Sequence, residues 1–178
     1  MKKPDLKKYF VFGILLSSSF SAFSSSRIGE VVVHESDGMP CFSIPKTSET
    51  REGSPLRGIF ITEQFSKDQN AIPAELWSLT AATPLSRPLL YPESCLLYGE
   101  TIKGTKQGIA PKELQPYRIY QVTLRAKKSE SSMIAYVGEF CITSRSGKRN
   151  IIQISSDERM GSKRYDVCKS EVNVRMQR

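Results

Sequence analysis

The sequence predicts an all-β fold, a single antiparallel β-sandwich stapled by disulfides. Three observations lead to this prediction: short segments with strand character recur at short intervals, clusters of glycine, proline and serine separate them, and no segment of about 12 residues has a convincing apolar period of 3.6 residues. With 178 residues, 39% hydrophobic and 25% charged, the chain has the composition of one globular domain. This composition excludes a disordered chain and a membrane protein with several spans.

Residues 1–24 have the parts of a cleavable secretory signal peptide. Four lysines precede the apolar run 10–16, and Ala22-Phe23-Ser24 is the best small-residue cleavage motif after it. The run is far shorter than the roughly 20 apolar residues of a spanning helix, which argues against the alternative of an uncleaved anchor. No cysteine lies at the cleavage site to carry a lipid, since the first is Cys41, so we expect a periplasmic protein with no stable membrane anchor. Cleavage lowers the net charge from +8 to +5, and no nucleic acid partner is expected for an exported protein.

Four cysteines beyond this segment predict two disulfides: Cys41, Cys95, Cys141 and Cys168. The spacing excludes a zinc site, because no two cysteines are closer than 27 residues. Four cysteines allow three connectivities, and the residues alone leave them open. We expect Cys41–Cys95 and Cys141–Cys168, since the second pair would then join two consecutive C-terminal strands. A structural role is expected, with redox chemistry as the alternative.

The predicted strands each have a local signal in the sequence. Segment 28–34 contains three consecutive valines, and 41–44 alternates until a proline ends it. Segments 58–65 and 74–81 contain alternating apolar residues and aromatic side chains. A proline-rich connection follows, and the glycine-rich segment 99–111 is predicted to be a loop. The remaining predicted strands are 95–98, 117–126 with its hairpin partner 133–143, 151–154 and 165–174.

The mature chain is expected to form one domain in three consecutive parts. Residues 25–40 are an N-terminal segment, residues 41–143 form the core of the sandwich, and residues 144–178 add C-terminal strands to the same domain.

A short motif at the beginning of one strand narrows the choice among β-sandwich folds. Leu114, Pro116 and Tyr120 are similar to the L-x-P…Y-x-V pattern of immunoglobulin and fibronectin type III-like sandwiches. In those domains the tyrosine hydroxyl bonds back to the backbone upstream, a tyrosine corner, and Tyr120 would be that residue here. Trp77, the one tryptophan, is expected in the core. The alternative is an unrelated β-hairpin with a turn that begins at a proline.

Three cysteine-bearing pieces, read in order, resemble a known family. They are 41–45 (CFSIP), 95–99 (CLLYG) and 136–142 (YVGEFCI), with the Leu114–Tyr120 motif between the last two. The order is similar to that in small periplasmic lipoproteins of Gram-negative bacteria described as immunity proteins of type VI secretion. The resemblance spans residues 40–143 and implies a protein-binding role in the periplasm. Family members have a lipid-bearing cysteine that this chain lacks, and no family binding residues transfer to it.

The sequence contains little that indicates catalysis. His34 is the single histidine, which limits any Ser-His or Cys-His mechanism to that position, and no metal, nucleotide or flavin motif is present. We therefore expect no enzyme and no cofactor or metal site. Paired carboxylates supporting a cell-wall glycan hydrolase remain the alternative. The candidate carboxylates are scattered along the chain: Glu63, Glu75, Glu93, Glu100 and Glu139.

Basic residues and tyrosines are the candidate binding groups. Arg125, Lys127 and Lys128 precede the turn of the predicted hairpin and Arg149 follows the hairpin, so we expect both basic clusters at one end of the sandwich, where they attract an acidic partner. Tyr98 is a candidate exposed anchor, together with Tyr91 and Tyr165, because tyrosine and arginine are frequent in binding hot spots. A solubilising fringe of charges is the alternative.

These observations favour a monomeric binding protein that neutralises a secreted toxin by covering its active site. A rigid, disulfide-bonded scaffold lowers the entropic cost of such binding. The first alternative is a structural, adhesion or chaperone-like module of the envelope, which would bind by strand addition at a sheet edge. The second is the glycan hydrolase.

Overall fold

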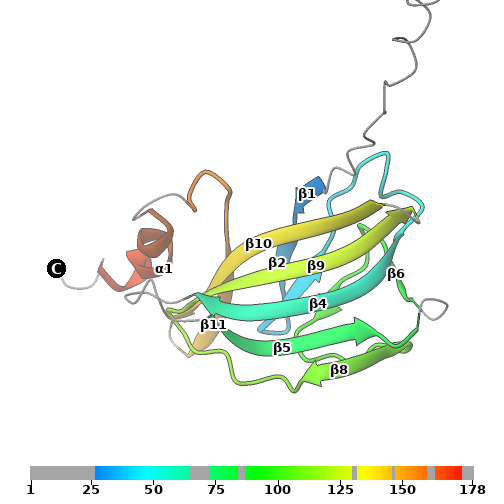
Figure 1. The fold of residues 1–178 in the computed structure, drawn as a ribbon. Helices are drawn as coiled ribbons and strands as arrows, with labels where there is room; N and C mark the ends of the chain where they lie inside the picture. The colour runs from blue at the N-terminus through cyan, green and yellow to red at the C-terminus, as the bar shows by residue number, and fades with distance from the viewer. Residues whose placement is uncertain are drawn as a thin grey trace, which may run out of the picture.

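The computed structural model describes residues 27–64, 73–83, 87–129, 132–145, 147–159 and 163–173, so the predicted signal peptide 1–24 lies outside the described residues. The described chain forms mostly β-strands in two sheets, with a short helix near its C-terminal end (Figure 1). In chain order the elements are β1 (Arg27–Glu30), β2 (Val32–Ser36), β3 (Met39–Ser43), β4 (Ser54–Gln64), β5 (Ala74–Ala81), β6 (Leu89–Leu90), β7 (Leu96–Leu97), β8 (Thr105–Ile109), β9 (Ile119–Ser129), β10 (Ser132–Arg145), β11 (Lys148–Ile154) and α1 (Lys163–Asn173).

The larger sheet has eight strands in the order β1-β10-β9-β4-β5-β8, with β11 also paired to β10 and β6 to β4. Strand β1 runs parallel to β10, and the other pairs are antiparallel. The long strands β9 and β10 form a hairpin in which Tyr120 lies opposite Phe140. The predicted pairing of 117–126 with 133–143 is therefore confirmed. The alternation along β9 places Tyr120, Val122 and Leu124 in the core.

The smaller sheet contains β2, β3 and β7 in that order. A two-residue turn, Asp37-Gly38, joins β2 to β3, and both residues have positive φ, 52° and 76°. Asp-Gly is the dipeptide that this type of hairpin turn favours, because its twist matches that of the strands. The Cys41–Cys95 disulfide fastens the chain just before β7 to β3, with 5.5 Å between the two Cα atoms.

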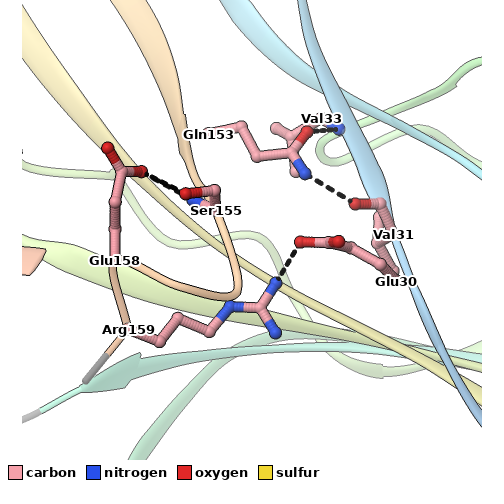
Figure 2. A network of polar contacts seen from close by, with 7 residues as sticks. All are labelled: Glu30, Val31, Val33, Gln153, Ser155, Glu158 and Arg159. Carbon is pink, nitrogen blue, oxygen red and sulfur yellow. Dashed lines mark hydrogen bonds and ion pairs between the residues drawn. The ribbon is translucent and has the colours of Figure 1, made fainter.

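The predicted strand 28–34 is in fact two strands that belong to different sheets. Strand β1 pairs with β10, and the chain then crosses at Val31 so that β2 pairs with β3. The run of valines does not reveal this crossing, because valine is favourable in either sheet. The side chain of Gln153 on β11 holds the crossing: its Oε1 accepts from the Val33 amide at 2.8 Å, and its Nε2 donates to the Val31 carbonyl at 3.1 Å (Figure 2).

One main core lies between the two sheets. Phe42 of the smaller sheet contacts Phe140 of the larger one, with 5.5 Å between ring centroids. Trp77 is fully buried, as predicted. The Tyr120 hydroxyl donates to the Gln115 carbonyl at 2.8 Å and accepts from the Gln115 amide at 2.7 Å. The predicted hydrogen bond from Tyr120 to the upstream backbone is thus confirmed.

Two other predicted elements are corrected. The glycine-rich segment 99–111 is not only a loop, because it contains β8, which pairs with β5. The predicted strand 165–174 lies largely in helix α1. The helix buries Cys168 and packs Tyr165 against a small second cluster, so too few apolar residues face inward to reveal a period of 3.6. The predicted Cys141–Cys168 disulfide is confirmed, but it joins this helix to β10 instead of joining two strands.

Candidate functional site

A solvent-open groove of about 370 Å³ lies where several loops of the two sheets meet. The β2–β3 turn and the first residues of β3 form one part of it, and the turn after β7 forms another. The extended segment 111–114 and single residues of β10 and β11 complete the lining. A volume of this size is at the lower end of the range for ligand pockets, roughly 300–1,000 Å³, and is enough for a few side chains of a partner.

Most of the lining is apolar. Leu114 and Ile142 are 4% and 1% exposed and belong to the main core, so the groove opens directly onto it. Met39, Pro40 and Pro111 add further apolar surface. Apolar surface of this kind gains free energy when a ligand covers it, about 25 cal/mol for each Å² removed from water.

Three side chains hold segment 111–115 in place through its carbonyl and amide groups. The Tyr98 hydroxyl donates to the Lys112 carbonyl at 2.8 Å, and Arg149 Nη2 donates to the Leu114 carbonyl at 2.6 Å. Tyr120 makes the third attachment, to Gln115. Burial raises the pKa of Tyr98 and of Tyr120 to about 12, so both hydroxyls remain neutral donors at any physiological pH.

The turn after β7 lies close against the same segment. Gly99 has φ 82°, and a Cβ at this position would lie 3.3 Å from two atoms of the Pro111 ring. Glycine therefore serves both the left-handed turn and the close approach. The Tyr98 amide donates to the Pro40 carbonyl at 2.9 Å. Together with the Cys41–Cys95 disulfide, these contacts make the groove a fixed feature of the fold.

Three charged side chains line the groove in different environments. Lys112 and Glu113 are exposed, whereas Arg149 is half-buried. Lys112 Nζ donates to the Glu75 carbonyl at 3.1 Å. Among the described residues, neither Lys112 nor Arg149 forms a salt bridge with a carboxylate.

The predicted binding residues do not form a single site. Arg149 and Tyr98 both line the groove, but Tyr98 is only 7% exposed, so the prediction of an exposed anchor is wrong. Its ring packs edge-on against Trp77 at 5.2 Å, which explains why an apparently free tyrosine is buried. Lys127 and Lys128 lie in β9, and their side chains are outside the described residues.

The two basic clusters also lie at opposite ends of the hairpin, which corrects the expectation that they share one end. Arg125 is opposite Ala135 and Arg149 is opposite Ser144 in the pairing with β10. These two β10 positions are nine residues apart, or about 30 Å along the strand. Arg125 stacks over the Phe60 ring at 4.7 Å and has no part in the groove.

The candidate catalytic groups are dispersed. His34 is exposed on β2 and does not line the groove. Glu63 pairs with Arg118 at 3.6 Å, and Glu139 lies 3.7 Å from Arg164. Glu93 pairs with Lys46, whose hydrogen bond lowers the pKa of that carboxyl. Glu113 is the one carboxylate in the groove lining, and within the described residues no group of histidine, cysteine and acidic side chains is placed to hold a metal.

Most of the groove cannot be predicted from the sequence. Its apolar residues come from separate parts of the chain, and no local sequence pattern predicts that the fold brings Met39, Pro111 and Ile142 together. One signal was available: Asp37-Gly38 between two apolar segments predicts a tight hairpin at which the groove begins.

Comparisons with protein-family models, with curated proteins and with solved structures find no match to this chain. In the part of the chain that the structure describes, no helix has the length and apolar character that crossing a membrane requires.

Proposed function

We propose that this protein is a periplasmic binding module with an immunoglobulin or fibronectin type III-like fold, and that it neutralises a secreted toxin by binding and covering it. The tyrosine corner at Tyr120 and the buried Trp77 support the finer fold assignment. The proposal includes export by the 1–24 signal peptide and a monomeric state before the toxin binds.

The observation that carries the proposal is which segments of the sequence supply the residues that line the groove. Tyr98 and Gly99 come from the second of the pieces that resemble type VI immunity proteins, and Ile142 comes from the third. Leu114 begins the motif between them, and Pro40 directly precedes the first piece. Two of the three pieces and the motif between them therefore contribute to one solvent-open surface, and the first piece begins directly after a lining residue, which supports a shared function at this surface.

The two alternatives have weaker support in the described structure. Strand addition needs an open edge, and β8 of the larger sheet and β2 and β7 of the smaller sheet each pair with a single strand among those described. However, β8 has five residues, an exposed lysine and an irregular register, and β2 and β7 have five and two residues, features that discourage pairing with another chain. Glycan hydrolysis needs two carboxylates across one cleft, and the groove lining contributes Glu113 alone.

Capture with a matched variant tests the proposal. The tagged protein, produced with its disulfides, is exposed to envelope and secreted fractions of its own organism, beside a Met39→Arg variant that places a charge in the groove. We expect one stoichiometric partner that survives a high-salt wash and that the variant loses. The captured protein is then produced in the periplasm of a host cell with and without this chain.

Growth arrest by the partner alone, relieved by co-production of this chain, is the expected result. A captured protein that leaves growth unaffected, such as a subunit of an envelope assembly, would instead favour the structural alternative. Absence of any partner would overturn toxin binding, and a glycan-release assay on cell-wall material would then test the hydrolase.

A further inference from the structure

The groove contains one charged side chain whose environment differs from the others. Lys112 and Glu113 are exposed, so solvent and salt screen their charges. Arg149 is half-buried in the lining, where a charge interacts more strongly with a ligand than it would in water. Its guanidinium carries five N–H donors, and one nitrogen binds the Leu114 carbonyl. Donors therefore remain for an acceptor that enters the groove.

The apolar part of the lining lies beside this cation. The Leu114 side chain contributes to the buried surface, while its carbonyl fixes the Arg149 guanidinium. Ile142 lies on β10, two residues before Ser144, the partner of Arg149 in the sheet. An occupant that fits both features needs an apolar group and an acceptor of negative charge close to one another.

A strained aromatic residue is hydrogen-bonded to Ile142, a residue of the groove lining. Tyr117 has φ 61°, an uncommon conformation for a bulky side chain, and is 44% exposed. Its amide donates to the Ile142 carbonyl at 2.7 Å, and its hydroxyl donates to the Ser144 carbonyl at 2.9 Å. Strain of this kind persists where surrounding contacts enforce it, and it is frequent at binding sites. Ser144 is also the residue opposite Arg149 in the sheet, and tyrosine and arginine are the residue types enriched in binding hot spots.

We propose that the groove binds a protein segment in which an aliphatic or proline side chain is next to the carboxylate of an aspartate or glutamate. The apolar side chain packs against Met39 and Pro111, the more accessible apolar residues of the lining, the carboxylate pairs with Arg149, and Tyr117 extends the contact. This inference rests on the proposed function, since it names the chemistry of the partner that the same groove binds.

Random peptides displayed on phage provide the probe, selected on the purified, disulfide-bonded protein. We expect enriched peptides to share an acidic residue beside an aliphatic residue or proline. Synthetic versions are then measured against the wild type, Arg149→Met, Arg149→Lys and the control Arg125→Met, whose arginine lies at the other end of the hairpin. Arg149→Met is expected to weaken binding about tenfold or more, and Arg125→Met to leave it unchanged.

Two further measurements make the result specific. Replacing the acidic residue of the peptide by its amide should weaken binding to the wild type and have little additional effect on Arg149→Met, as a direct pair requires. Arg149→Lys, which keeps the charge, should bind more tightly than Arg149→Met. Unfolding curves of all variants identify any loss that comes from misfolding.

Enriched peptides without a carboxylate, equal affinity of Arg149→Met and the wild type, or no enrichment would each overturn the inference. Its failure is distinguishable from failure of the proposed function. If the wild type and Arg149→Met neutralise a toxin equally well, the inferred groove chemistry is wrong and the proposed immunity function is retained. If acidic peptides bind as expected but no toxin is neutralised, the proposed immunity function is wrong and the inferred groove chemistry is retained.

Discussion

The side-chain amide of Gln153 bonds to the main chain at Val33 as the backbone of a neighbouring strand would. Its oxygen accepts from the Val33 amide, and its nitrogen donates to the carbonyl of Val31, a fully buried residue (Figure 2). One side chain thus satisfies backbone groups on both sides of Val32, at the point where the chain leaves one sheet for the other. Nearby, Arg159 pairs with Glu30 at 2.7 Å and fastens the end of β1.

Gln153→Ala is expected to destabilise the fold by about 2–4 kcal/mol, because it leaves a donor and an acceptor of the backbone without partners. Gln64→Ala is the matched control. It removes a glutamine that bonds to the side chain of Gln121, and it leaves no backbone group unpaired, so a loss of about 1 kcal/mol or less is expected. Urea unfolding of both variants measures the difference. Equal losses would show that Gln153 does not support the crossing.

Tyr120→Phe tests the tyrosine corner. The change removes a hydroxyl that both donates to and accepts from Gln115, so we expect a loss of about 1–3 kcal/mol while the ring continues to pack on Phe140. Segment 111–115 would lose one of the three side chains that bond to its backbone, and faster hydrogen exchange at the Gln115 amide should accompany the loss. Unchanged exchange at that amide would contradict this role for Tyr120.

Alkaline pH should weaken the fold through the same buried hydroxyls. Burial raises the pKa of Tyr98 and Tyr120 from about 10 to about 12. Below pH 10 both are neutral in the folded and unfolded chains, so their contribution to stability is complete. Between pH 10 and 12 the unfolded chain releases these protons and the folded chain keeps them, which lowers stability by up to about 1.4 kcal/mol per pH unit for each tyrosine.

The measurement for this prediction is the unfolding free energy of the wild type and of Tyr120→Phe from pH 8 to 12. The advantage of the wild type should be constant below pH 10 and shrink above it, because phenylalanine does not ionise. A constant difference across the whole range would contradict the raised pKa of Tyr120.

The sequence predicts the parts of this fold whose signals are local. Alternation predicts the β9–β10 hairpin. The Leu114–Tyr120 motif predicts that the Tyr120 hydroxyl bonds to the backbone a few residues upstream, where Gln115 lies. The crossing at Val31 was missed because the side chain that enables it, Gln153, is 122 residues away. The groove was missed for the same reason, since its apolar residues become neighbours only when both sheets pack. Helix α1 was missed because a disulfide, more than an apolar face, keeps it on the sheet.

The two disulfides should therefore have separable roles. The double variants Cys41→Ala/Cys95→Ala and Cys141→Ala/Cys168→Ala are each expected to lose about 3–4 kcal/mol of unfolding free energy. The first disulfide closes a loop of 54 residues and the second a loop of 27, and each variant gives its loop back its freedom in the unfolded chain. The first should also weaken peptide binding, because it frees a wall of the groove. The second should leave binding intact and speed hydrogen exchange in α1, whose apolar contacts are few.

These expectations are checked by unfolding curves, peptide affinity and hydrogen exchange on the same two double variants. Protection of α1 that survives loss of Cys141–Cys168 would show that packing alone docks the helix. Peptide affinity unchanged by loss of Cys41–Cys95 would show that the disulfide does not shape the groove.

Gly99→Ala tests whether the width of the groove matters for binding. Gly99 and Gly147 have nearly the same φ, 82° and 81°, so alanine at either position should cost about 1–2 kcal/mol for the left-handed conformation. The two positions differ in their surroundings. A Cβ on Gly99 lies 3.3 Å from the Pro111 ring, whereas nothing lies within 4 Å of one on Gly147. Only Gly99→Ala must displace Pro111, a lining residue, so only this variant should lose affinity for the selected peptides. Equal affinity of the two variants, at equal stability, would place the binding surface elsewhere.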